Sequence, residues 1–440
     1  MKKSYLKEFF DYTFLSTLGT IGVSCYILAD TFFISQSLKA DGLTALNLAI
    51  PVYNFIHGTG LMLGIGGATK FSIYKSQNKQ AKINRLYTNT ILLALVFTVI
   101  FTLGGLFFSN TLARMLGAND QVLIMTDTYL KWLMLFSGAF ILNDVLLCYV
   151  RNDGNPKLSM LAMLIGSFAN IVLDYVFIFP MQMGIFGAIL ATGLSPIISI
   201  MIMAKHWLSK KKGFYLVKTI FRFTLVKDIL SLGFPSLIVQ LSSGIVMIIF
   251  NLLIGNITGN RGIAAYGVVA NISLVIVSIY TGIAQGIQPI ISYAFGKQDK
   301  SKILAIWRYT IISVVVISVV LYALLFVNAN KVVTVFNSGN DLKLQLIAVE
   351  GIKIYFLSNL FVGYNTVLAI FFTSIEQALP AHLLSLLKGF IIIIPLAFIL
   401  SALYQMTGIW LTYPLTELIV AVLGYLWYCF LKKKIINGEK

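Results

Sequence analysis

Four acidic residues lie inside stretches of the chain that are otherwise apolar: Asp30, Asp144, Asp174 and Glu417. A charged side chain at the centre of a bilayer costs at least about 2.5–3.5 kcal/mol on insertion scales, so such groups face a bundle interior or a water-filled cavity. A carboxylate held there can take up and release a proton, and hard cations prefer oxygen ligands of this kind. Acids in such positions are therefore candidates for a proton or cation site.

Asp30 and Asp174 each have a polar neighbour one helical turn away. Tyr26 precedes Asp30 by four residues and Asn170 precedes Asp174 by four, so each pair lies on one face of its helix. We expect the two faces to meet across the bundle and form a proton or sodium site, to which Thr192 adds a hydroxyl. The alternative for Asp30 is a carboxylic acid that is hydrogen-bonded structurally within the bundle. For Asn170 and Thr192 it is interhelical hydrogen bonding that only holds the bundle together.

Asp144 and Glu417 are secondary candidates, which could belong to a substrate cavity. Asp144 lies near the inner end of its predicted span and could instead cap the bundle or pair with Arg151. Glu417 could pair with Lys388, the one basic residue that we place deep within a span. For these acids a structural role is the favoured hypothesis. No cofactor is expected, and no metal site other than the possible sodium site.

The composition places these acids in a membrane. Of 440 residues, 58% are hydrophobic and 11% are charged, whereas about a quarter of a soluble domain is charged. Continuous apolar runs of about 20 residues, each long enough to cross the hydrocarbon core, recur along the chain. We therefore predict an all-α integral membrane protein with twelve transmembrane helices. The predicted spans are roughly residues 13–37, 43–69, 86–109, 122–150, 158–179, 184–204, 229–256, 262–294, 309–328, 346–374, 381–404 and 409–431.

The net charge of +17 is explained by membrane topology. Most of the 33 lysines and arginines fall in the segments that lie inside when the N-terminus is placed inside, as the positive-inside rule requires. Twelve spans then leave both termini in the cytoplasm. A nucleic-acid partner is not needed to explain the basic charge, and we predict none.

The basic segment 208–228 divides the chain into two predicted lobes of six helices each, 1–207 and 229–440. Setting position 40 opposite position 260 aligns ADGLTAL (40–46) with NRGIAAY (260–266), and the predicted span boundaries coincide in the same register. We therefore predict two pseudo-symmetric lobes, related by an axis along the membrane normal.

The repeat also predicts that any ion site lies in the first lobe only. In a slightly different register, which sets position 156 opposite position 380, Asn170 meets Ile394 and Asp174 meets Phe398, so the second lobe lacks this polar pair. Two lobes that rock around a central cavity are typical of a secondary transporter. The sequence has no Gly-rich phosphate loop, so we expect no direct coupling to ATP within this chain. It also has no His-rich metal cluster of the kind that membrane-embedded hydrolysis needs, and we predict that the chain is not an enzyme. The longest outer segment, 329–345, is too short for a receptor or scaffold domain.

The sequence resembles the multidrug and toxic compound extrusion (MATE) family in three stretches. These are YILADTFFISQSLKADGLTALNLAIPV (26–52), RNDGNPKLSMLAMLIGSFANIVLDYVFIF (151–179) and GIFGAILAT (184–192). The resemblance implies a multidrug efflux transporter of a bacterial inner membrane, which exports cationic amphipathic drugs by antiport with protons or sodium ions; we expect a monomer. It also implies a coupling site in the first lobe. Its residues would be Asp30, Asn170 and Asp174, with Tyr26 and Thr192 as neighbours.

Two departures from the family pattern narrow this expectation. Ser243 stands where one branch of the family carries a glutamate, and the stretch 15–25 lacks a proline that other members have in the first helix. We therefore do not expect coupling through the second lobe or through a proline-driven bend. The alternative function is a flippase for lipid-linked saccharides or other lipid precursors. That function calls for several cationic side chains in the lumen, and Lys388 is the one we place deep in a span.

Overall fold

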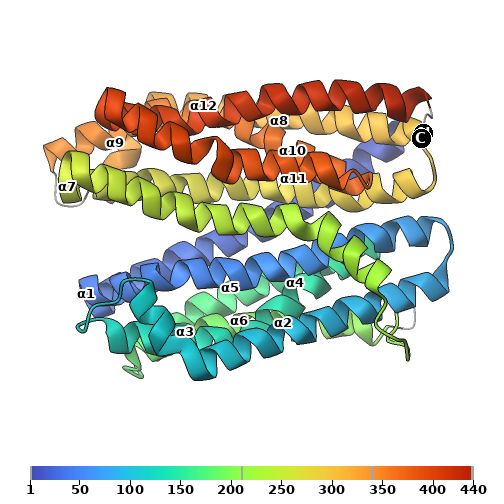
Figure 1. Ribbon diagram of the computed structural model, residues 1–440, viewed down its shortest axis with the longest axis horizontal. Helices are drawn as coiled ribbons and strands as arrows, with labels where there is room; N and C mark the ends of the chain where they lie inside the picture. The colour runs from blue at the N-terminus through green and yellow to red at the C-terminus, as the bar shows by residue number, and fades with distance from the viewer. Residues whose placement is uncertain (1, 210–211, 338–340, 438–440) are drawn as a thin grey trace. The chain divides into compact units, whose positions relative to one another are not determined.

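The computed structural model describes residues 2–209, 212–337 and 341–437. Every regular element in these ranges is helical (Figure 1). The prediction of an all-α protein is therefore confirmed. Residues 210–211 of the predicted linker, 338–340 of the outer segment and 438–440 of the second predicted lobe lie outside the described residues. The helices are α1 (Lys2–Ser76), α2 (Gln80–Met115), α3 (Leu123–Leu135), α4 (Ser137–Asn152), α5 (Pro156–Ile178), α6 (Gly184–Trp207), α7 (Phe223–Gly296), α8 (Lys300–Phe336), α9 (Leu342–Tyr355), the 3₁₀ turn η1 (Phe356–Ser358), α10 (Asn359–Ser374), α11 (Ala378–Leu386), the π-helical turn η2 (Leu387–Ile391) and α12 (Ile393–Asn437).

The described helices are long and apolar enough for a multi-pass membrane protein. Eight helical segments in the described ranges pass this test, and the count is nine when α3 and α4 together form one span. Those two helices meet at an angle of 47°, at Phe136, whose ψ of 0° ends the first helix. The chain is therefore embedded in a membrane, as the composition predicts.

Three of the long helices contain a residue with non-helical backbone angles: Lys39 in α1, Gly259 in α7 and Gln405 in α12. Lys39 (φ 53°, ψ −140°) and Gly259 (φ 65°, ψ −154°) adopt nearly the same conformation, and the register that pairs 40–46 with 260–266 places one on the other. Asn78 (φ 56°) and Gln298 (φ 59°) form a second pair of left-handed residues in that register. The backbone thus agrees with the internal repeat found in the sequence.

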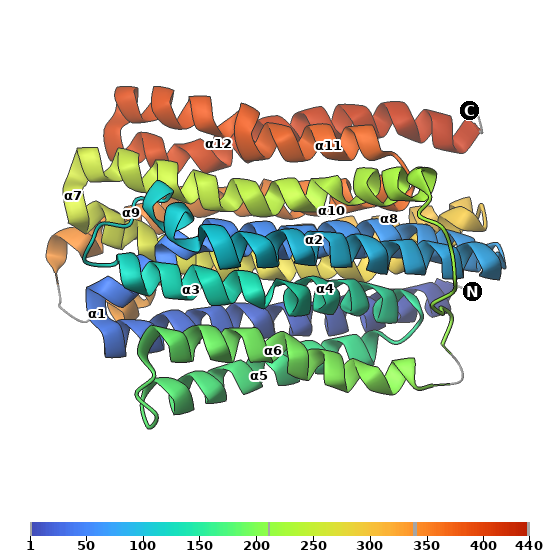
Figure 2. The ribbon, with the colours of Figure 1, turned by 60° about the horizontal axis from the view of Figure 1, so that its bottom comes forward.

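The chain divides into two compact units. The N-terminal unit comprises Phe14–Leu241 and Ser292–Gln298, and the C-terminal unit comprises Met1–Thr13, Ser242–Ile291 and Asp299–Lys440. Within the N-terminal unit α5 packs along α6, and α4 contacts both (Figure 2). Within the C-terminal unit α10 packs against α8 and α12. These units have other bounds than the two predicted lobes, 1–207 and 229–440, which remain a prediction.

Glycines allow the closest helix crossings in each unit. In the N-terminal unit, a Cβ on Gly66 of α1 would overlap the carbonyl group of Ile229 at the start of α7. In the C-terminal unit, a Cβ on Gly286 of α7 would lie 2.6 Å from Cα of Thr13, at the start of α1. Small residues are needed wherever two helix backbones approach this closely. The repeat register places Gly66 on Gly286, so the two crossings follow the repeat.

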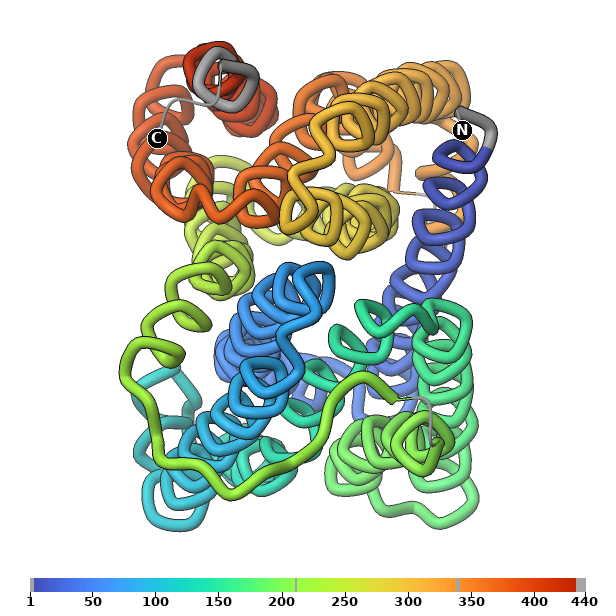
Figure 3. The backbone as a smooth tube through the Cα atoms, turned by 90° about the vertical axis from the view of Figure 1, so that its right-hand side faces the viewer, coloured from blue at the N-terminus to red at the C-terminus, as the bar shows by residue number. Residues whose placement is uncertain are grey.

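Residues 212–222, here called the strap, run in extended form along the N-terminal unit between α6 and α7 (Figure 3). Side chains of α2 hold its backbone by accepting hydrogen bonds from its N–H groups. The bonds run from Tyr215 to Asn84 (3.1 Å), from Val217 to Thr88 (3.1 Å) and from Arg222 to Asn89 (3.0 Å). Backbone groups that no helix or sheet satisfies need such partners, and α2 supplies them.

Candidate functional site

Asp30 of α1 and Asp174 of α5 lie in the interior of the N-terminal unit, with 6% and 0% of their surface exposed. The two carboxylates are close enough to interact electrostatically. In each of them Oδ1 is buried and has no hydrogen-bond partner among the described residues. A buried carboxylate oxygen without a donor is costly as an anion, so this arrangement favours a bound proton or cation.

Asn170 and Thr192 complete the polar surroundings of Asp174. When the amide of Asn170 is oriented so that both of its ends are satisfied, its Nδ2 donates to Oδ2 of Asp174 at 3.0 Å. Its oxygen then accepts from the backbone N–H of Thr192 at 3.3 Å. Tyr129 of α3, which is 3% exposed, interacts electrostatically with both Asp30 and Asp174 and hydrogen-bonds to Thr192. Helices α1, α3, α5 and α6 therefore meet at one polar cluster.

Close packing of α5 against its neighbours sets the position of this cluster. A Cβ on Gly22, two turns before Asp30, would lie 2.6 Å from the side chain of Leu164 on α5. On the other side of α5, the hydroxyl of Ser195 on α6 donates to the carbonyl oxygen of Gly166 at 2.8 Å. Both contacts depend on a glycine, which lets the helices that carry the polar residues approach closely.

Tyr26 interacts electrostatically with Asp30, as its position one turn earlier predicts, but its hydroxyl lies 2.9 Å from that of Tyr53. Tyr53 belongs to the part of α1 that follows the break at Lys39. Sequence reasoning missed both Tyr53 and Tyr129. A chain with 21 tyrosines and 32 phenylalanines gives no spacing signal that separates a buried polar tyrosine from one that faces lipid.

Asp144 of α4 has a partner that the sequence did not suggest. Its Oδ2 lies 2.8 Å from Nδ1 of His57 on α1, and the two side chains are 6% and 25% exposed. We expected Asp144 to cap the bundle or to pair with Arg151 on its own helix. The contact with His57 crosses between helices instead, which a search along one helix could not find.

A hollow of about 360 Å³ lies beyond the acidic pair in the N-terminal unit. It is lined by Ser37, Leu38, Ile178, Phe179, Gln182 and Gly184. Ser37 follows Asp30 by two helical turns, and Ile178 follows Asp174 by one turn. The hollow is therefore on the side of the cluster toward which α1 and α5 run.

Glu417 lies in the C-terminal unit, separate from the other acids, and is 1% exposed. Its Oε1 lies 3.7 Å from Nζ of Lys388, which confirms the predicted pair. Asn365 of α10 donates to Oε2 of Glu417 at 2.6 Å and was missed in the sequence. Lys388 is part of the π-helical turn η2, a type of helix irregularity that often occurs at functional sites.

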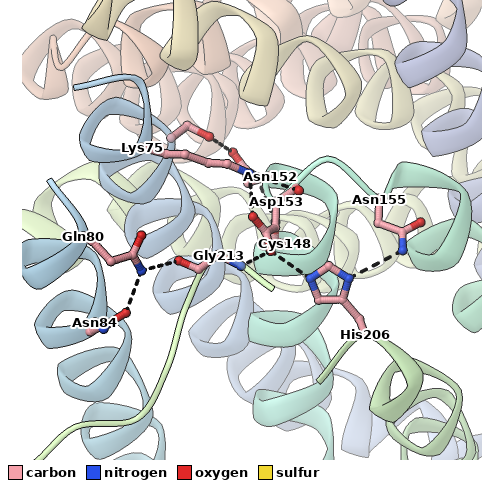
Figure 4. Close-up of polar contacts among 10 residues, drawn as sticks. Lys75, Gln80, Asn84, Cys148, Asn152, Asp153, Asn155, His206 and Gly213 are labelled. Atoms are coloured by element: carbon pink, nitrogen blue, oxygen red, sulfur yellow. Dashed lines mark hydrogen bonds and ion pairs between the residues drawn. The ribbon is translucent and has the colours of Figure 1, made fainter. Parts of the chain in front are cut away.

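A second polar cluster surrounds Asp153, in the loop between α4 and α5 (Figure 4). Nε2 of His206 lies 2.9 Å from Oδ2 of Asp153, and Lys75 donates to its Oδ1. The backbone N–H of Gly213 in the strap donates to Oδ2 at 2.6 Å. Asn155 lies 3.5 Å from Nδ1 of His206, which fits an imidazole that carries its proton on Nε2.

These contacts change the acidity of Asp153. Burial of the carboxyl group favours its neutral form. Hydrogen bonds from His206, Lys75 and Gly213 outweigh that effect and hold the pKa of Asp153 below its usual range. Sequence reasoning missed this cluster because it searched for acids inside spans, and Asp153 lies between two of them.

Comparisons with known proteins agree on one family. A family model described as MatE matches residues 16–176 and 235–399, which is more than half of the chain. The multidrug export protein MepA of Staphylococcus saprophyticus is 26% identical over 436 residues, covering 99% of this chain and 96% of that protein. MepA of Staphylococcus aureus strain MRSA252 is 25% identical over 438 residues, with the same coverage. The solved outward-facing structure of a multidrug resistance MATE family transporter of the MOP superfamily superimposes with a TM-score of 0.91 at 22% identity. That match covers 98% of this chain and 96% of the other, and shows a shared fold.

Proposed function

Because the chain belongs to the MatE family, we propose that it is a secondary active exporter of cationic amphipathic drugs. Family membership also confirms the resemblance found in the sequence. The curated relatives are named multidrug export proteins. Membership of a transporter family also confirms that the chain is not an enzyme. We further propose that export runs by antiport with protons or sodium ions, in a bacterial inner membrane with both termini in the cytoplasm.

Twelve transmembrane segments fit this proposal. The described part of the chain has nine candidate spans when the bent pair α3 and α4 is taken as one. The breaks at Lys39, Gly259 and Gln405 divide α1, α7 and α12 into two segments each. Counting these segments separately supports the twelve transmembrane helices that we propose.

The observation that carries the coupling proposal is the buried pair Asp30 and Asp174, each with an unpartnered Oδ1 among the described residues. A proton or a sodium ion bound there neutralises a charge that is costly inside the bundle. When the bound ion is released, the carboxylates keep a negative charge that attracts a cationic drug. The ion and the drug therefore compete for the negative charge of the N-terminal unit. Asn170, Thr192 and Tyr26 supply the polar groups around the two carboxylates.

The hollow beyond the acidic pair supports this role. Among its lining residues, Ser37 follows Asp30 by two helical turns on α1, and Ile178 follows Asp174 by one turn on α5. We propose that the coupling ion approaches the two carboxylates from this side, which is the outside of the cell in the proposed topology.

The pairing of Lys388 favours drug export over the flippase alternative. A flippase for lipid-linked saccharides requires free cationic side chains that hold phosphate. Lys388 has Glu417 at 3.7 Å, and that carboxylate already compensates its charge.

Dye efflux tests the proposal. Inverted vesicles that contain the full chain are given either a proton gradient or a sodium gradient. Fluorescence then follows the transport of ethidium that each gradient drives. We expect transport with one of the two gradients, and its loss in Asp30→Asn and Asp174→Asn. Asp120→Asn is the matched control, because that side chain is 94% exposed. Unchanged ethidium transport in Asp30→Asn would contradict the proposed site.

A further inference from the structure

His57, which is half-buried, and Asp144, which is buried, form an acid–base pair that the proposed coupling site does not use. The imidazole Nδ1 lies 2.8 Å from the carboxylate Oδ2, with side chains 25% and 6% exposed. Histidine is the one side chain whose unperturbed charge changes between about pH 5 and 8. A pair of this kind, inside a transporter that we propose to run by antiport with protons or sodium ions, suggests a protonatable site besides Asp30 and Asp174.

The helix packing fixes this contact. Gly60 and Gly64 follow His57 on the same face of α1, by three and seven residues. A Cβ on Gly60 would lie 2.6 Å from Oδ2 of Asp144, and one on Gly64 would lie 2.9 Å from the backbone oxygen of Asp144. The two backbones therefore approach at Asp144, and the position of the pair follows from the helix crossing.

Tyrosines connect the pair with the proposed coupling site. The ring of His57 stacks on that of Tyr53, with centroids 5.9 Å apart and an interplanar angle of 14°. The hydroxyl of Tyr53 lies 2.9 Å from that of Tyr26. Both tyrosines interact electrostatically with Asp30 and with Asp144. The two tyrosines therefore lie between the pair and Asp30, and no described contact joins the two carboxylates directly.

The other titratable groups nearby do not duplicate this function. On α4, Cys148 lies next to Gly64 and interacts with Asp144 and with Arg151. Arg151 stays charged throughout the physiological range. On α3, Tyr129 interacts with Tyr53 and with Asp30. Among these groups the imidazole of His57 is the one suited to exchange a proton near neutral pH.

We propose that the His57–Asp144 pair is a second proton-carrying site, which releases one proton when a cationic drug binds and takes one up when the drug leaves. With its proton, the pair consists of an imidazolium and a carboxylate and has no net charge. Without it, the pair has a neutral imidazole and one negative charge, which balances the charge of the bound cation. This inference rests on the proposed function and adds to it a second proton, independent of Asp30 and Asp174.

The test counts the protons that are released on binding. Tetraphenylphosphonium is a cationic amphipathic probe without a titratable group, so every proton released comes from the protein. It is added to the purified full chain in weakly buffered detergent solution at several values between about pH 5.5 and 8. We expect His57→Gln to release about one proton fewer than the unmodified protein within this window. We expect Asp30→Asn still to release the proton that comes from the His57–Asp144 pair.

His57→Lys separates a proton-carrying role from a structural one. A lysine keeps a positive charge beside Asp144 but does not lose it in this pH range. We expect this variant to keep its thermal stability and to release as few protons as His57→Gln. His382→Asn, in the C-terminal unit, is the matched control and should release the full number. The chain has three histidines, so the ¹³Cε1 resonance of His57 can be assigned with these variants and its titration followed directly.

Two results would overturn the proposal, and they can be told apart by whether the unmodified protein binds the probe. Equal proton release by the unmodified protein and by His57→Lys at every pH would exclude the second site and leave the role of Asp30 standing. A failure of the unmodified protein to bind tetraphenylphosphonium would overturn the proposed drug class, and the second site with it.

Discussion

The backbone N–H of Gly213 donates to Oδ2 of Asp153 at 2.6 Å, and this bond fastens the strap to the loop between α4 and α5. A Cβ on Gly213 would collide with the same carboxylate, so this residue must be small. Lys75 at the end of α1 donates to Oδ1 of Asp153, and His206 at the end of α6 shares Oδ2 with Gly213. One carboxylate therefore holds together two helix ends, a loop and the strap.

Replacing this carboxylate should loosen the N-terminal unit. We expect Asp153→Asn to lower the free energy of unfolding by about 1–3 kcal/mol, because it leaves buried donors without their charged acceptor. The thermal midpoint of the purified protein, measured by fluorescence, reports the loss. Asp120→Asn, at an exposed position, should leave the midpoint unchanged.

The pH dependence of this difference follows from the lowered pKa of Asp153. A carboxyl group whose pKa is lower in the folded than in the unfolded chain stabilises the fold above the unfolded value of about 3.9. That contribution is lost as the pH falls through the folded value. We therefore expect the midpoints of the unmodified protein and Asp153→Asn to converge below about pH 4. A constant difference down to the folded pKa would contradict this assignment.

Phe214 anchors the strap in an aromatic pocket and is 1% exposed. Its ring lies 4.6 Å from that of Tyr87 and 5.5 Å from that of Tyr149, measured between centroids. Truncating a buried phenylalanine costs about 3–5 kcal/mol. We expect Phe214→Ala to release the strap and make it sensitive to limited proteolysis. Phe221→Ala is the control, since that side chain is 48% exposed in the same strap.

Gly233 of α7 allows the close crossing with α1 in the N-terminal unit. An added Cβ would overlap the carbonyl group of Met62, and a backbone group cannot move aside as a flexible side chain can. We expect Gly233→Ala to lower the thermal midpoint, at a cost of about 1–3 kcal/mol for overpacking. Gly267→Ala on the same helix meets no atom within 4 Å and should be neutral or slightly stabilising. Equal midpoints for the two variants would refute the close crossing.

Patterns within one helix were enough to predict much of this protein. The apolar runs predicted helices and a membrane location, and the spacing of Asn170 and Asp174 placed their side chains together. The alignment of 40–46 with 260–266 predicted a repeat that the backbone shows at Lys39 and Gly259. Each of these features depends on period or composition, which a single chain displays directly.

Contacts between helices were not predictable in the same way. His57 and Asp144 lie far apart in the sequence, and no spacing rule links them. Asp153 and Gly213 belong to a loop and a strap, where the path of the backbone decides which groups meet. Lys388 and Glu417 could be paired from the sequence because few charges lie deep in the predicted spans, so each has few possible partners.

Thr192 should tune the coupling site without abolishing it. Thr192→Val keeps the side-chain shape and removes the hydroxyl that bonds to Tyr129, while the backbone N–H toward Asn170 remains. We expect the apparent affinity for the driving ion to fall about 2- to 10-fold, as for the loss of one hydrogen bond. Vesicle transport at graded ion concentrations measures this change. Thr44→Val, whose hydroxyl is exposed, should leave the apparent affinity unaltered.

The pair of Lys388 and Glu417 gives a test of charge compensation inside the C-terminal unit. Glu417 is 1% exposed, so removing its partner leaves an uncompensated buried charge. Breaking such a pair costs about 3–5 kcal/mol, whereas replacing both members by neutral residues is often close to neutral. We expect Lys388→Met to lower the thermal midpoint strongly and the double variant Lys388→Met with Glu417→Gln to recover most of the loss. In the double variant Asn365 still has a side-chain oxygen to which it can donate. Equal midpoints for the single and double variants would show that Lys388 does not compensate the charge of Glu417.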